Sequence, residues 1–147
     1  PFSAGTALGL VRDMSHMFQD SSFNQDISGW IVDNVTDMSR MFSGADQFNN
    51  VVSAKNPNLG WDVHQVKNMS GMFAGAAKFN NGGSLDWDAC GNTGGWDTGN
   101  VTNMSYMFDG AVNFNGNIST WDVSQVTNMS YMLDVAVTFK GNISTCD

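Results

Sequence analysis

The 147-residue sequence has few cations and no long apolar run. Six Lys and Arg side chains stand against 14 acidic ones, which gives a formal net charge of −8. A phosphate-rich surface is bound by clustered cations, so neither nucleic acid nor an anionic membrane surface is an expected partner. No apolar run approaches the ~20 residues that cross a bilayer, so we expect no direct membrane insertion.

Catalytic side chains are equally scarce. The two histidines, His16 and His64, each occupy a variable position of a repeated motif. No G-x-S-x-G, Walker or H-E-x-x-H pattern occurs. Because an enzyme needs a nucleophile, base or metal constellation, we expect a non-enzymatic protein without a cofactor.

Charge of either sign is low, at 14% of residues. A polar but weakly charged surface rich in Asn, Ser, Thr and Gly is typical of an extracellular or cell-surface protein. The opening "PFSAGTALGL" has no initiator Met and no signal peptide, which indicates a processed or partial product.

All ten methionines fall in one string that occurs five times, for example "NVTDMSRMF" at 34–42 and "NVTNMSYMF" at 100–108. The full unit reads V-x-[DN]-M-S-x-M-[FL]-x-x-[AS]-x-x-F, then a variable stretch, then W-[DI]-[VT]. Such self-similarity is the signature of a repeat architecture. We expect one domain over 11–147, preceded by an N-terminal lead or cap over 1–10. Its five units are 11–34, 35–65, 66–100, 101–125 and 126–147, with loop insertions near 50–60 and 81–95.

The spacing within a unit predicts its local structure. In unit two, an apolar stripe at i, i+3, i+6, i+7 and i+10 begins at Val35, which predicts a short helix or helical turn. The later I-x-x-W-x-V segment predicts a short strand. One unit cannot bury its own stripe, so we expect an α/β repeat solenoid, leucine-rich-repeat-like, with five stacked units. The methionines would form its core; the alternative is a soft-metal site or an adaptable groove.

Two polar positions recur with the stripe. The Asp or Asn before Met-Ser is expected to cap the start of the helical segment. Asn also follows the last Phe in four units, and stacked Asn side chains would satisfy neighbouring backbone groups. These residues are Asn24, Asn49, Asn80 and Asn115, with Lys140 in the fifth unit.

The strings "NVTDMSRMFSGADQFN" and "ISTWDVSQVTNMSYM" resemble the repeats of BspA-like surface proteins, which are leucine-rich-repeat relatives. The resemblance runs from Leu10 to Asp147. It implies a solenoid with a stacked parallel sheet on a secreted or cell-surface protein that serves adhesion and host or matrix binding. The two insertions, and Cys146 in place of Trp, depart from the family pattern, so no particular ligand is transferred.

Several residues are candidates for modification. Seven Asn-x-Ser/Thr sequons are glycosylation candidates: Asn34, Asn68, Asn100, Asn103, Asn117, Asn128 and Asn142. The other reading is that copying the unit multiplied the sequons. Asn117 and Asn142 are expected to be more accessible than the capping Asn68, Asn103 and Asn128. Cys90 and Cys146 either form a disulfide or remain two thiols.

Two acidic groups are candidates for binding. Asp86, Trp87 and Asp88 form a candidate ligand loop in the second insertion. Asp62, Asp97 and Asp122 follow tryptophans and would hold Ca²⁺ if stacked on one face. Repeated surface Asp more often serves solubility and turn chemistry, so the sequence favours no metal.

The ends of the stack bear on function. The fifth unit stops at Cys146 and Asp147 with no cap, so either the parent chain continues or another body covers the face. A second copy there would build head-to-tail fibres, while the mid-chain loops offer lateral contacts. We therefore expect a structural or adhesive surface protein that self-assembles end to end. The alternative is a binding module for a protein or glycan, using its exposed sheet or inserted loops.

Overall fold

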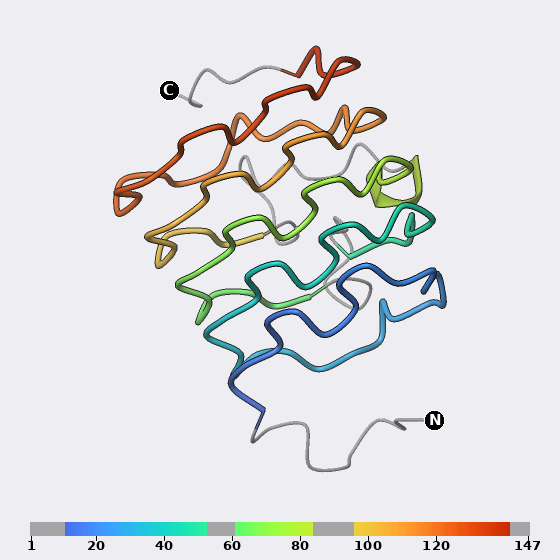
Figure 1. Ribbon diagram of the computed structural model, residues 1–147. Helices are drawn as coiled ribbons and strands as arrows, with labels where there is room; N and C mark the ends of the chain where they lie inside the picture. Colours follow the sequence, from blue (N-terminus) through green and yellow to red (C-terminus); the bar gives the residue numbers. More distant parts are fainter. Residues whose placement is uncertain (1–10, 53–60, 84–95, 142–147) are drawn as a thin grey trace.

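The computed structural model describes residues 11–52, 61–83 and 96–141. The repeat units lie one above another as windings, from the N-terminal blue end to the C-terminal red end (Figure 1). We name these windings coils one to five, with the bounds of the five sequence units. Coil five is described as far as residue 141.

The expected α/β solenoid, with a strand and a helix in each unit, is wrong. Within the described ranges the only helix is the 3₁₀ helix η2, Asn81–Gly83, and no residue is in a named strand. Neighbouring coils pair instead through isolated parallel bridges at one motif position: Asp13–Asp37, Asp37–Asn68, Asn68–Asn103 and Asn103–Asn128. No helix in the described part of the chain is long and apolar enough for a bilayer crossing.

Overlapping turns replace the predicted helix. In coil two, three N–H groups each donate to the carbonyl oxygen three residues earlier: Met41 to Met38, Ser43 to Arg40 and Ala45 to Phe42, at 3.0 to 3.3 Å. Side chains in such a series also recur every three or four residues. The series of turns therefore produces the same apolar stripe that led us to predict a helix.

The other N–H groups of the segment leave the coil. Met38, Arg40, Phe42 and Gly44 donate to the carbonyl oxygens of Asn68, Ser70, Met72 and Ala74 in coil three, at 2.7 to 3.0 Å. The same alternation joins coil one to coil two, coil three to coil four and coil four to coil five. Half of the segment's donors thus stabilise turns, and half hold the next coil.

Backbone conformation explains why the segment is not helical. Two positions of every unit, four residues apart, have positive φ, which a right-handed helix does not allow. The first position holds His16, Arg40, Gly71, Tyr106 and Tyr131; the second holds Asp20, Gly44, Gly75, Gly110 and Val135. Each is the third residue of a turn, where a type II geometry requires positive φ.

Turns also replace the predicted strand. Trp30 donates its N–H to the Ile27 carbonyl oxygen, and Val35 donates to that of Val32. The tryptophan side chain then ties the coil to its neighbour, because the Trp61 indole Nε1 donates to the Ile27 carbonyl oxygen at 3.0 Å. Trp96 makes the equivalent bond to Val52, also at 3.0 Å. This half of the unit therefore pairs through a buried side chain.

The predicted methionine core is confirmed for eight of the ten methionines, which are buried. The exceptions lie in the outer coils, where Met17 is 45% exposed and Met129 is 44% exposed. Two columns of Phe rings run beside the methionines. Rings in successive coils stack at 5.4 to 5.7 Å in the column Phe18, Phe42, Phe73 and Phe108. They stack at 5.8 to 6.3 Å in the column Phe23, Phe48, Phe79, Phe114 and Phe139.

The predicted asparagine stack is also confirmed. Each Asn Oδ1 accepts the backbone N–H at the matching position of the next coil, at 2.7 to 2.9 Å, in the order Asn24 to Asn49, Asn80, Asn115 and Lys140. The Asp or Asn before Met-Ser caps a turn, because its Oδ1 accepts the N–H of the residue two positions later, at 2.8 to 3.1 Å. The capping residues were predicted correctly, but each one caps a turn and not the start of the expected helix.

Replacing Met72 with Ala should lower the free energy of unfolding by about 2–5 kcal/mol, because the cavity would lie in the middle coil, where the side chain is fully buried. Met129→Ala is the matched control, since its side chain is already half in solvent, and it should cost far less. Urea unfolding followed by tryptophan fluorescence measures both. Equal losses for the two variants would contradict the stacked core.

Replacing Asn80 with Ala removes the acceptor for the Asn115 N–H. An unsatisfied, partly buried donor should cost about 1–3 kcal/mol in the free energy of unfolding. Asn113→Ala, at an exposed position of coil four, is the control and should be nearly neutral. The ladder has no energetic role if both variants unfold at the urea concentration of the unchanged protein.

Candidate functional site

One row of variable side chains faces solvent across all five coils. It consists of the residues after Met-Ser: His16, Arg40, Gly71, Tyr106 and Tyr131. Their φ angles agree within 52° to 60°, so each coil presents this position in the same way. The four members that carry a side chain are exposed, and the Tyr106 and Tyr131 rings stack at 5.0 Å. The repeat thus fixes the backbone and leaves the chemistry of this row free to vary.

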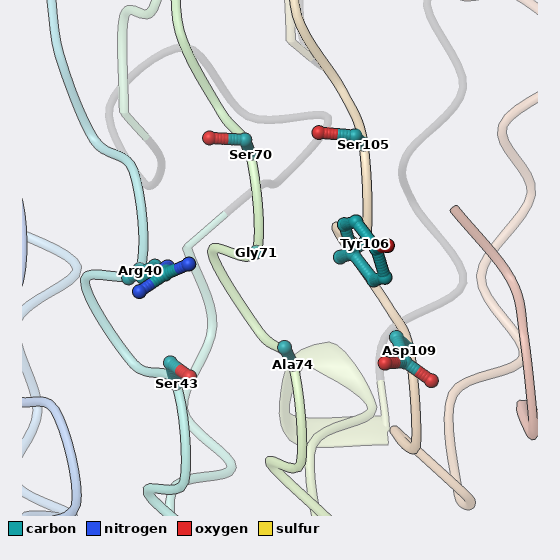
Figure 2. Close-up of a pocket in the computed structure, with 8 residues that line it drawn as sticks. All are labelled: Arg40, Ser43, Ser70, Gly71, Ala74, Ser105, Tyr106 and Asp109. Atoms are coloured by element: carbon teal, nitrogen blue, oxygen red, sulfur yellow. The ribbon is translucent and has the colours of Figure 1, made fainter. Parts of the chain in front are cut away.

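Gly71 opens a groove in that row. The motif-face groove has a volume of about 410 Å³ and crosses coils two, three and four. Its floor is Gly71 and Ala74, as Figure 2 shows, with Arg40 and Ser43 on one side and Tyr106 and Asp109 on the other. Ser70 and Ser105 complete the lining. A side chain at residue 71 would fill the space that its neighbours border.

The two walls of the groove have opposite charge. Arg40 lies against the bare backbone of Gly71, since a Cβ there would be 3.2 Å from the Arg40 Cγ. Within the described ranges the one ion pair joins His64 to Asp62, so Arg40 and Asp109 do not neutralise each other. A guanidinium, a carboxylate, an exposed phenol ring and serine hydroxyls thus border one opening. Such a set donates and accepts hydrogen bonds and offers a flat face.

Most of the sequon Asn side chains that the structure describes form hydrogen bonds within the protein. The Oδ1 atoms of Asn68, Asn103 and Asn128 cap turns, as predicted. The Asn34 Nδ2 donates to Asp33 at 3.0 Å, and the Asn100 Nδ2 donates to the His64 carbonyl oxygen at 2.7 Å. The predicted order of accessibility is wrong for one pair, because Asn128 is exposed while Asn117 is half-buried. Asn128 belongs to coil five, the last coil that the structure describes.

The three aspartates after tryptophan act in turns. The Oδ1 atoms of Asp62, Asp97 and Asp122 accept the N–H of the residue two positions later, at 2.9 to 3.2 Å. Hydrogen bonds from the Ser124 N–H and then its hydroxyl lower the pKa of Asp122. Among the described residues, no group of three or more Asp, Glu, His or Cys side chains is placed so that it could hold a metal ion. The geometry supports the turn-chemistry interpretation of these aspartates.

Further carboxylates show the same turn chemistry. The Ser15 hydroxyl and N–H lower the pKa of Asp13, and the Ser28 N–H and hydroxyl lower that of Asp26. The two histidines lie in different coils: His16 contacts Gln19, and His64 contacts Asp62. The remaining sequence candidates lie outside the described residues: Asn142, Cys90, Cys146, Asp86, Trp87 and Asp88.

The groove was not predicted from the sequence. In the repeated motif the residue after Met-Ser is variable, but nothing in the sequence showed that this position has positive φ and points outward. The signal was present, since Gly71 is the one glycine among His, Arg and Tyr at this position. Gly71 could indicate a gap only after the structure had shown that this row of residues lies on the surface.

Comparison with known proteins identifies the family. No curated protein and no solved structure matches the chain. Residues 7–93 and 88–147 match the family described as "Mycoplasma protein of unknown function, DUF285", and the two matches together cover most of the chain. The chain therefore belongs to the DUF285 family.

Proposed function

We propose that this chain is a non-enzymatic, adhesive cell-surface protein that binds an extracellular glycan in the motif-face groove. The observation that carries the proposal is the gap at Gly71 in a row of otherwise large, exposed side chains. Rigid repeats commonly bind through the surface on which variable residues are presented side by side.

The lining of the groove fits a sugar ring. Arg40 supplies several donors in a fixed fork, and Asp109 supplies acceptors on the opposite wall. The Tyr106 ring, 45% exposed, offers an apolar face with a polar tip. The formal charge of −8 repels polyanions at long range, so a neutral glycan fits better than a strongly acidic one.

A bound peptide strand fits the groove less well. Strand addition needs free backbone N–H and carbonyl groups at an edge. Along the floor of the groove the Gly71 N–H already donates to the Ser105 carbonyl oxygen at 2.7 Å, and the Arg40 N–H donates to Ser70 at 2.9 Å. Recognition must therefore come from side chains, which suits the hydroxyl groups of a glycan.

The resemblance to BspA-like surface proteins supports the proposed location. The strings that carry the resemblance, 34–49 and 118–132, include the turns that hold Arg40 and Tyr131, two members of the row of variable residues. Adhesion at a cell surface would use such a row directly. The leucine-rich-repeat geometry of those relatives plays no part in the proposal.

Screening the protein on a glycan array, followed by calorimetric titration of the best neutral glycan, tests the proposal. Gly71→Tyr should weaken binding at least about tenfold, which is ~1.4 kcal/mol, because it places in the gap the residue that coil four carries there. It should fold, since four coils accept a side chain at the same φ. Tyr106→Ala should also weaken binding, because it removes the aromatic ring from the wall of the groove.

Lys78→Ala is the control for these variants, because Lys78 is exposed on coil three and does not line the groove. It should bind as the unchanged protein does. Two results would contradict the proposal: no retained glycan on the array, or unchanged affinity of Gly71→Tyr. Capture of a matrix protein that persists after enzymatic deglycosylation would also count against it.

A further inference from the structure

The motif-face groove separates one cationic side chain from one anionic side chain. Arg40 on the coil-two wall and Asp109 on the coil-four wall are the charged members of its lining. At this position the Arg40 and Gly71 N–H groups each donate to the following coil, at 2.9 and 2.7 Å. Backbone segments joined in this way lie ~5 Å apart, so the two walls stand ~10 Å apart across coil three.

The coil-two wall presents hydrogen-bond donors to the groove. The Arg40 side chain lies over Gly71, where a Cβ would be 3.9 Å from the Arg40 Nε, so the guanidinium reaches toward coil three. Ser43 follows on the same wall, and Figure 2 shows both side chains beside the floor at Ala74. A planar guanidinium next to a hydroxyl binds phosphate or carboxylate oxygens through paired N–H donors. This wall therefore fits the anionic part of a ligand.

The coil-four wall presents an aromatic face and a carboxylate. Tyr131 of coil five stacks on the Tyr106 ring at 5.0 Å, which leaves the other face of that ring for the groove. Asp109 lies on the same wall and forms no ion pair with any residue that the structure describes. An ammonium group donates hydrogen bonds to a carboxylate and is attracted to the face of an aromatic ring. This wall therefore fits the cationic part of a ligand.

We infer that the glycan bound in the motif-face groove carries a zwitterionic substituent, with its phosphate or carboxylate at Arg40 and its ammonium at Asp109. The inference rests on the proposed function and names the chemical class of the ligand. An ion pair forms at about 4 Å, so two such contacts across a ~10 Å opening leave room for only a short linker between the ligand's two charges. Phosphoethanolamine on a sugar has this form. Its net charge is zero, so the formal charge of −8 does not repel it at long range.

Calorimetric titration with four forms of the best neutral saccharide from the array tests the inference. One form is unsubstituted, and the others carry phosphate alone, an aminoethyl group alone or phosphoethanolamine on the same hydroxyl group. The phosphoethanolamine form should bind at least about tenfold more tightly than the unsubstituted one, which is ~1.4 kcal/mol. Either single charge should add less, because it leaves the charge on the opposite wall without a partner. Added salt should reduce this preference, since it screens both ion pairs.

Two substitutions assign the charges of the ligand to the walls. Asp109→Asn and Arg40→Gln should each bring the preference, the ratio of the two affinities, close to one, because each removes one wall charge. Asp46→Asn and Lys78→Gln are the matched controls, since they make the same changes of net charge at exposed positions outside the groove lining. Both controls should keep the preference of the unchanged protein. Thermal melts confirm that each variant is folded.

The outcomes separate this inference from the proposed function. Equal affinity for the unsubstituted and phosphoethanolamine forms would overturn the inference and leave glycan binding intact, and so would a preference that persists in both groove variants. Failure of all four forms to bind would overturn both proposals. Vesicles that contain phosphatidylethanolamine display the same head group without a sugar. Co-sedimentation with them that Asp109→Asn abolishes would assign the zwitterion to a lipid and overturn its assignment to a glycan.

Discussion

The fold depends on how each motif segment divides its backbone N–H groups. One set closes turns inside the coil, and the alternate set donates to the coil above. A unit on its own would therefore leave half of these donors without a protein partner, besides exposing its methionines and phenylalanines. Stacking satisfies both needs at once, which is why the same string recurs in every unit. The Asn ladder and the tryptophan indoles add further bonds between neighbouring coils, and in these bonds the later coil is the donor.

This division also determines which residues can vary. The Phe and Asn positions contact their counterparts in the neighbouring coils, so a change in an inner unit disturbs two contacts. The residue after Met-Ser faces solvent at positive φ and has no such counterpart in the core. Arg, Gly and Tyr can therefore follow one another in successive coils, and the motif-face groove results from that freedom.

The sequence predicted the repeat, most of the core and the polar ladders, because these depend only on which residues recur. It did not predict the backbone. A stripe such as Val35, Met38, Met41 and Phe42 arises in a helix and in a series of turns alike. Gly44, Gly75 and Gly110 were the available sign, since three glycines at one repeat position indicate positive φ. The tryptophan segment was predicted as a strand because of its β-branched residues, yet its order comes from a buried indole. The groove depends on the turn geometry of the backbone, so it could not be predicted before those turns were known.

Scalar coupling across hydrogen bonds, measured by NMR on isotope-labelled protein, tests the division of N–H groups most directly. The Phe42 amide nitrogen should couple to the carbonyl carbon of Met72, in the next coil, because their hydrogen bond measures 2.9 Å. An α-helix over the same segment would instead bond the Phe42 N–H to Met38, four residues earlier. Coupling to Met72 is the expected result, and coupling to Met38 would contradict the stacked-turn fold.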